Sequence, residues 1–322
     1  MPSEVAARIS AVSKYFGDFK AVSDLSFEVP TGLIYGILGP NGAGKSTTLR
    51  MLNDIIAPDR GEIELLGRFG PGLEAARHIG YLPEERGLYP KMRVGETLEF
   101  FAQLRGLDGG EARRRAGQWL ERLGLGEWMG KLVQDLSKGM QQKVQFASAL
   151  IHDPELLILD EPWSGLDPLN ADVLRDIVLE HRDKGHTVLF STHLMEQAEK
   201  ICDRVCIIAH GERVLEGELG AIRRDAAPVG LVALELATDA MSAKARESVL
   251  ADPTLVASIK ERNDHLEIQL AVDVSPDRML RELVEAGLSV RRFEQFEPTL
   301  HQIFVDEVGS AAMPRSPKGE HV

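Results

Sequence analysis

The sequence predicts an α/β layered domain with an inserted helical subdomain, followed by a small α+β domain of ferredoxin-like type. Up to about residue 225, short apolar runs typical of buried strands alternate with segments of helical periodicity. Between about residues 84 and 150 the strand signals stop and helical periodicity takes over, which indicates the insertion. We therefore expect domains at 1–225 and 230–308, with a disordered tail at 309–322.

Three apolar runs in the first domain are expected to be buried strands. They are LIYGILG (33–39), LLILDEP (156–162) and TVLFSTH (187–193). Each run ends in glycine or in polar residues. Ligands of open α/β sheets collect beyond the carboxyl ends of the strands, so we expect a functional site there.

The second domain follows the order strand, helix, strand, strand, helix, strand, which is the ferredoxin-like arrangement. The segments are LVALELAT (231–238), MSAKARESVL (241–250), TLVASIKE (254–261), HLEIQLAV (265–272), SPDRMLRELVEAG (275–287) and LSVRRFEQ (288–295). A last helix, PTLHQIFVDEV (298–308), is expected to close this domain.

Charge and composition exclude several classes of protein. The 322-residue chain has a net charge of −13 and an isoelectric point near 5.2. This acidity disfavours binding to a nucleic-acid backbone or unaided binding to anionic lipid. The sequence shows no signal peptide and no apolar run of the roughly 18 residues that span a bilayer. We interpret Cys202 and Cys206 as small buried side chains of a reduced compartment rather than metal ligands.

A phosphate-binding loop is the strongest motif. GPNGAGKST fits the pattern G-x-x-x-x-G-K-[ST] and lies between a predicted strand and a predicted helix. The predicted nucleotide ligands are Gly39, Pro40, Asn41, Gly42, Ala43, Gly44, Lys45, Ser46 and Thr47. Lys45 is expected to reach the β- and γ-phosphates, and the Ser46 hydroxyl to bind Mg²⁺. The motif predicts ATP and Mg²⁺ as ligands.

An acidic pair supplies the predicted chemistry. Asp160 ends a buried strand, where a carboxylate needs a cation or hydrogen bonds, and Mg²⁺ held through water would serve. Glu161 follows at once and is expected to point to the other face of the strand. That position suits a base that deprotonates an attacking water.

A second possible anion site begins at LSKGMQQK, about 90 residues after the first. Ser137 is a good N-cap residue, and a glutamine follows about three residues later, as in a capping box. The segment is therefore either an ordinary capped helix or a helix N-terminus that binds phosphate. The two interpretations are compatible, because a cap aims the free N–H groups outward.

Together these motifs resemble the ATP-binding subunit of ABC transporters, from Val5 to about Leu219. GPNGAGKST matches Walker A, LLILDEP matches Walker B, SGLD (164–167) matches the D-loop, and LSKGMQQK occupies the signature position. The resemblance implies that His193 contacts the γ-phosphate and acts with Glu161 and Lys45 in catalysis. It also implies that Phe16 stacks on adenine, with Tyr15 as the alternative.

The same resemblance implies that two such domains pair head to tail, each ATP lying between Walker A of one chain and the signature of the other. The signature residues that would contact the partner's ATP are Leu136, Ser137, Lys138, Gly139 and Met140. Lys138 and Met140 depart from the usual glycine and glutamine. Glu84 stands where the family has glutamine; a carboxylate still binds Mg²⁺ but has no amide donor.

The ending FEPTLHQIFVDEVG resembles the accessory domain of an exporter-like subgroup that includes sodium-extrusion and drug-export ATPases. The implied partners are transmembrane permease subunits, docked near residues 84–91, and a second ATPase chain, identical or paralogous. No nucleic-acid partner is expected. The implied location is the cytoplasmic face of the membrane, reached through the permease. The alternatives are a soluble ABC-type ATPase and an ATPase regulated by a ligand-sensing C-terminal domain.

Overall fold

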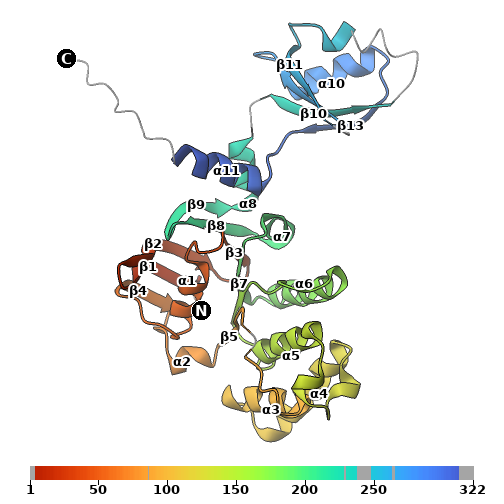
Figure 1. Ribbon diagram of the computed structural model, residues 1–322. Helices are drawn as coiled ribbons and strands as arrows, with labels where there is room; N and C mark the ends of the chain where they lie inside the picture. The colour runs from red at the N-terminus through yellow and green to blue at the C-terminus, as the bar shows by residue number, and fades with distance from the viewer. Residues whose placement is uncertain (1–3, 86, 228–229, 238–247, 263–264, 312–322) are drawn as a thin grey trace, which may run out of the picture. The chain divides into compact units, whose positions relative to one another are not determined.

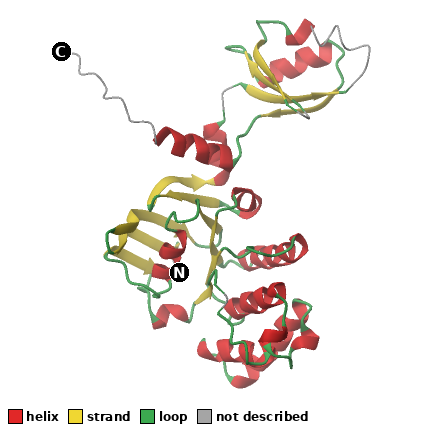
Figure 2. Ribbon diagram, viewed as in Figure 1, coloured by secondary structure: helices red, strands yellow, loops and turns green. Residues whose placement is uncertain are grey.

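The computed structural model describes residues 4–85, 87–227, 230–237, 248–262 and 265–311 (Figure 1). The chain divides into two compact units: the first runs to Leu219 and resumes at Phe304, and the second spans Gly220–Ile303. Each unit has its own sheets, visible in yellow in Figure 2.

A parallel sheet forms the centre of the first unit. Its strand order is β5-β6-β7-β3-β8-β9, and only the last pair is antiparallel. The bounds are β3 Ile34–Leu38, β5 Ile79–Leu82, β6 Leu156–Asp160, β7 Thr187–Thr192, β8 Arg204–Ala209 and β9 Glu212–Glu218. Every residue of β3, β6 and β7 is buried, as expected for parallel strands covered on both faces.

A second, antiparallel sheet has the order β2-β1-β4, with β1 Val5–Phe16, β2 Phe19–Pro30 and β4 Arg60–Leu65. Helix α1 (Lys45–Leu52) contacts strands of both sheets, and residues of both share one hydrophobic core. Figure 1 shows α5, α6 and α7 on the other side of the parallel sheet. Both sheets therefore pack against the helix that directly follows the loop at residues 39–44.

The expected helical insertion lies between β5 and β6. It contains α3 Val94–Leu104, α4 Gly109–Arg122 and α5 Lys138–Leu150, with two short 3₁₀ turns at Gly126–Trp128 and Val133–Asp135. Further helices of the first unit are α2 Leu73–Ala76, α6 Pro168–Asp183 and α7 Met195–Ile201. Asp167 caps α6 by accepting a hydrogen bond from the Asn170 N–H, and Pro168 occupies its first turn.

The second unit contains an antiparallel sheet of order β11-β12-β10-β13, the strand arrangement of a β-α-β-β-α-β domain. Its elements are α8 Leu219–Ala226, β10 Leu231–Leu236, β11 Val256–Glu261, β12 Leu266–Leu270, α10 Pro276–Glu285 and β13 Val290–Gln295. Helix α10 buries Met279 and Leu283 in a core separate from that of the first unit. Most of the helix expected at 241–250 lies outside the described residues.

The C-terminal helix differs from the expectation. We expected it to close the second domain and a tail to begin at 309. Instead, α11 (Leu300–Ala311) continues past that point, and from Phe304 it belongs to the first unit. The rest of the expected tail, 312–322, lies outside the described residues.

Candidate active site

The loop between β3 and α1 has a shape that only glycine permits. A Cβ on Gly39 would stand 2.1 Å from the Ile208 carbonyl oxygen, and one on Gly44 would stand 2.6 Å from the Ala21 carbonyl oxygen. Both residues also have positive φ angles, of 154° and 104°. Gly44 caps α1, so the loop leads directly into the helix N-terminus, where free N–H groups attract anions.

Lys45 lies at the base of this loop. The residue is only 5% exposed. Its Nζ donates hydrogen bonds to the carbonyl oxygens of Gly39, at 2.8 Å, and Pro40, at 3.1 Å. The same ammonium lies 3.7 Å from Glu161 Oε1. Burial lowers the pKa of Lys45, while the nearby Glu161 opposes that shift. A phosphate in the loop would add further negative charge beside this buried cation.

Asp160 is positioned by two hydroxyl groups. Its Oδ1 accepts hydrogen bonds from Ser191 Oγ, at 2.5 Å, and Ser46 Oγ, at 3.1 Å. Its Oδ2 is buried and has no hydrogen-bond partner among the described residues. Burial raises the pKa of Asp160, and the two hydroxyl bonds oppose the rise. A buried, unpartnered carboxylate oxygen beside a serine hydroxyl fits a hard cation such as Mg²⁺.

Glu161 reaches the site through an unusual backbone rather than through strand alternation. Strand β6 ends at Asp160, and Glu161 has a φ of 47°, in the left-handed region. Its N–H donates to both the carbonyl and the Oγ of Ser191, each at 3.2 Å. The prediction that it points to the other face of the strand is therefore wrong in its reason: a turn, not the pleat, aims this side chain.

The Glu161 carboxylate is tied to the end of β7. Oε2 accepts a hydrogen bond from Thr192 Oγ1 at 3.2 Å, and Oε1 lies 2.9 Å from His193 Nδ1. Because an ionised carboxylate only accepts, His193 Nδ1 carries the proton in this contact. Glu161, Lys45 and His193 thus converge, with Glu161 at the centre.

A pocket of about 500 Å³ covers this group. Its lining includes these predicted residues: Phe16, Asn41, Gly42, Ala43, Gly44, Lys45, Ser46, Thr47, Glu84, Glu161 and His193. Three predicted residues do not line the pocket: Gly39, Pro40 and Asp160. The first two accept hydrogen bonds from Lys45, and Asp160 accepts one from Ser46. Of the two candidate aromatic residues, Phe16 lines the pocket and Tyr15 does not. This favours Phe16 as the residue that stacks on adenine.

The signature segment lies apart from this pocket. None of Leu136–Met140 lines it, and Ser137 and Lys138 are exposed. Ser137 is the N-cap of α5, its Oγ accepting from the Met140 N–H at 3.3 Å. The capping box is not formed: Gln141 Nε2 donates to the Leu136 and Val133 carbonyls instead.

Helix α5 also holds the segment around Glu84. Gln145 Nε2 donates to the carbonyl oxygens of Glu85, at 2.9 Å, and Pro83, at 3.3 Å. Glu84 itself lines the pocket from this segment. A single amide therefore connects the signature helix to the two neighbours of Glu84, the residue at the glutamine position of the family.

Several residues of the site were missed in the sequence. Ser191 and Thr192 orient the two acids, Phe19 lines the pocket, and Gln145 positions the Glu84 segment. The only available signal was that Ser191 and Thr192 directly precede His193. The expectation that Cys202 and Cys206 are buried is confirmed, and both are free thiols. Trp163 packs edge-on against Phe190, with ring centroids 4.8 Å apart.

Comparison with known proteins decides the family. Residues 22–164 match the family model described as ABC transporter, and residues 217–308 match the model described as ATP-binding protein DrrA1-3-like, C-terminal domain. YhaQ of Bacillus subtilis, named an uncharacterized ABC transporter ATP-binding protein, is 41% identical over 94% of this chain and 98% of its own. The chain belongs to the ABC transporter ATP-binding proteins. This ABC protein is accordingly an ATPase of the P-loop fold.

Other relatives agree along most of the length. The daunorubicin/doxorubicin resistance ATP-binding protein DrrA of Streptomyces peucetius is 32% identical, over 97% of this chain and 94% of its own. A solved structure titled "Structure of ATP binding subunit of ABC transporter" is 33% identical, with a TM-score of 0.64, and covers 68% of this chain and 92% of that one. ABC ATP-binding subunits work with transmembrane permeases. In the described part of this ABC protein, no helix combines the length and apolarity needed to cross a membrane.

Proposed function

We propose that this ABC protein hydrolyses ATP to drive export through separate transmembrane subunits. The convergence of Lys45, Glu161 and His193 beside the buried, unpartnered Asp160 Oδ2 carries the proposal for the chemistry. Relatives named for drug resistance and for Nod factor export support the direction of transport. The DrrA-like C-terminal domain supports it as well.

In this mechanism the loop from Gly39 to Thr47 binds the phosphates, and Phe16 stacks on the adenine ring. Lys45 exchanges its bonds to the Gly39 and Pro40 carbonyls for phosphate oxygens. Ser46 and Asp160 would hold Mg²⁺, with Glu84 beside them. The ion, when bound, neutralises charge on the phosphates and orients them for in-line attack.

Glu161 acts as the base. Its carboxylate takes a proton from the attacking water, whose oxygen forms a bond to the γ-phosphorus. The bond from that phosphorus to the bridging oxygen breaks, and ADP leaves with the electron pair. Thr192 and His193 hold the carboxylate in place by their bonds to Oε2 and Oε1. For His193 to donate to the γ-phosphate as well, it would use Nε2 in the imidazolium form, because Nδ1 already donates to Glu161.

The signature residues complete the site of a second chain. Their distance from the pocket of their own chain, together with the exposed N-terminus of α5, favours contact with another copy's triphosphate. ATP thereby binds the closed pair more tightly than the open one, and hydrolysis reverses that preference. The second copy is either this chain or a paralogue.

The test is assembly. The Glu161→Gln variant in Mg-ATP should run as a dimer in sizing with light scattering, and Ser137→Ala added to it should weaken that dimer. A Glu161→Gln protein that stays monomeric at saturating ATP contradicts the dimer. Co-expression with the permease should bring the chain to membranes; a chain that stays soluble instead favours the alternative of a soluble ABC-type ATPase. The charge of −13 argues against a nucleic-acid partner for it.

A further inference from the structure

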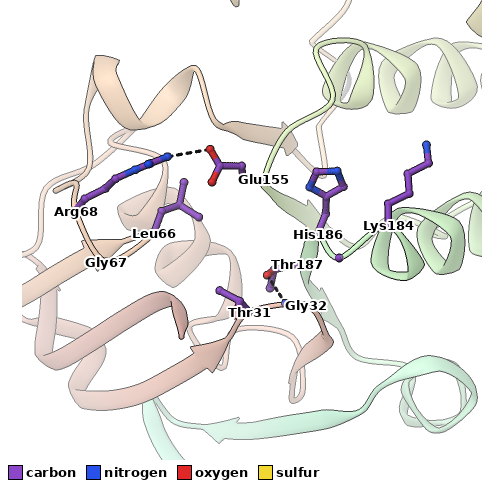
Figure 3. A pocket seen from close by; sticks show the side chains of 10 residues that line it. Thr31, Gly32, Leu66, Gly67, Arg68, Glu155, Lys184, His186 and Thr187 are labelled. Atoms are coloured by element: carbon purple, nitrogen blue, oxygen red, sulfur yellow. Dashed lines mark hydrogen bonds and ion pairs between the residues drawn. The ribbon is translucent and has the colours of Figure 1, made fainter. Parts of the chain in front are cut away.

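Three potential metal ligands gather at the sheet edge opposite the nucleotide pocket. Asp153 precedes β6, His186 directly precedes β7, and His181 lies in the last turn of α6. One ligand atom of each lies within 4.8 Å of those of the other two. Figure 3 shows His186 at a separate pocket of about 580 Å³, between Glu155 and Lys184.

His181 is the observation that points to a ligand. It is only 3% exposed, and its Nε2 is buried with no hydrogen-bond partner in the described part of the chain. In the tautomer that carries its proton on Nδ1, the Nε2 atom has a free lone pair.

A buried neutral imidazole with an unpartnered nitrogen is a common metal ligand. Burial also lowers the pKa of His181 to about 4, which keeps the ring neutral near pH 7. Packing alone does not account for the unpartnered Nε2 atom of His181, because an unsatisfied buried acceptor costs about 1–3 kcal/mol.

The other two ligands can move. His186 stacks on His181, with ring centroids 4.5 Å apart and planes 17° apart, and its Nε2 lies 3.8 Å from Asp153 Oδ1. Their side chains are 23% and 56% exposed, and His186 lines a pocket into which it can turn. Zinc bonds of about 2.1 Å place tetrahedral ligands roughly 3.4 Å apart, so both side chains turn inward on binding.

We propose that Asp153, His181 and His186 bind one Zn²⁺ ion, with the fourth position open to water. Two imidazoles and one carboxylate form a donor set that suits Zn²⁺, whereas Mg²⁺ prefers oxygen ligands alone. The ion ties the starts of β6 and β7 to the end of α6. The opposite ends of these three elements carry Asp160, His193 and the cap Asp167.

The experiment is a Zn²⁺ titration of the untagged protein by calorimetry, with millimolar Mg²⁺ present to occupy oxygen-only sites. The wild type should bind one equivalent. His186→Ala and Asp153→Asn should each weaken this binding at least tenfold; asparagine suits the φ of 57° at position 153. His78→Gln is the matched control, because His78 also lies beside a carboxylate, 2.7 Å from Glu155 Oε1, but outside the cluster.

A second readout is the visible spectrum of the Co²⁺-substituted protein. Intense bands from four-coordinate Co²⁺ should appear in the wild type and in His78→Gln, and be lost in Asp153→Asn. The proposal is overturned if the wild type takes up no zinc in excess Mg²⁺, or if all variants bind it equally. It does not depend on the proposed export function.

Discussion

Glu161 Oε1 and His193 Nδ1 lie 2.9 Å apart, although 32 positions separate the two residues in the sequence. Strands β6 and β7 pair in parallel, with Asp160 opposite Ser191, so their following residues meet at one edge. The proposed base is consequently held by the strand next to its own. Substitutions at the end of either strand should therefore alter the position of the Glu161 carboxylate.

We expect Glu161→Gln to lower ATP turnover roughly 10²- to 10⁴-fold, because the amide cannot take a proton from water. ATP affinity should be retained, since the phosphate loop is unchanged. The measurements are phosphate release and equilibrium binding. Glu155→Gln, which removes a carboxylate at the opposite edge, is the control and should keep normal turnover. Normal turnover in Glu161→Gln would remove this residue from the role of base.

Lys45→Ala should weaken ATP binding roughly 10- to 100-fold, the effect of losing about 1.5–3 kcal/mol of charge-assisted hydrogen bonding. Calorimetry with a non-hydrolysable ATP analogue measures it. Lys184→Ala removes a lysine at the far pocket and should bind as the wild type does. An unchanged affinity in Lys45→Ala would contradict the assignment of the loop.

The proposed Mg²⁺ site predicts a metal-dependent stabilisation by nucleotide. ADP should raise the melting temperature more with Mg²⁺ than with a chelator. Asp160→Asn should abolish the difference, because Asp160 is the buried acid that Ser46 contacts. Asp183→Asn, at an exposed position, should keep the difference. Thermal melting of the three proteins, each with Mg²⁺ and with a chelator, gives the answer. An undiminished metal effect in Asp160→Asn would exclude Asp160 as a ligand.

Gln145→Leu should increase the mobility of the segment around Glu84 without changing ATP affinity. The substitution removes two hydrogen bonds to the Pro83 and Glu85 carbonyls, at a cost of about 1–3 kcal/mol. Hydrogen exchange at the Glu84 and Glu85 amides should quicken. Gln103→Leu, on an exposed face, is the comparison. Unaltered exchange would show that α5 does not hold this segment.

Leu283→Ala should destabilise the second unit by about 2–5 kcal/mol, because Leu283 is fully buried in its core. Val284→Ala, next to it and 60% exposed, should change little. All three tryptophans, Trp119, Trp128 and Trp163, lie in the first unit. Urea unfolding should shift early by circular dichroism and stay constant by tryptophan fluorescence. A shift in both signals would show one cooperative core.

Local patterns in the sequence predicted much of the site. The loop from Gly39 to Thr47 is contiguous, and its glycines are dictated by backbone crowding that the motif encodes. Asp160 was predictable because four apolar residues precede a buried acid. Ser137 was predictable as a cap for the same local reason.

Relations that depend on strand order were not predictable. The contact of Ser191 with Asp160 requires β7 to neighbour β6, and no short pattern states which strands pair. The hold of Gln145 on the Glu84 segment likewise joins residues 60 or more positions apart. The division of α11 between units depends on packing rather than on helical periodicity.

The left-handed backbone at Glu161 bears on how inactive forms of this ABC protein should be prepared. A β-branched replacement such as valine would add main-chain strain, of order 1–3 kcal/mol, to the loss of the carboxylate. Asparagine tolerates this conformation and glycine adopts it freely. The yield of folded protein for each substitution at position 161 should therefore depend on how readily the new residue adopts a left-handed backbone conformation. It should not depend on whether the variant hydrolyses nucleotide.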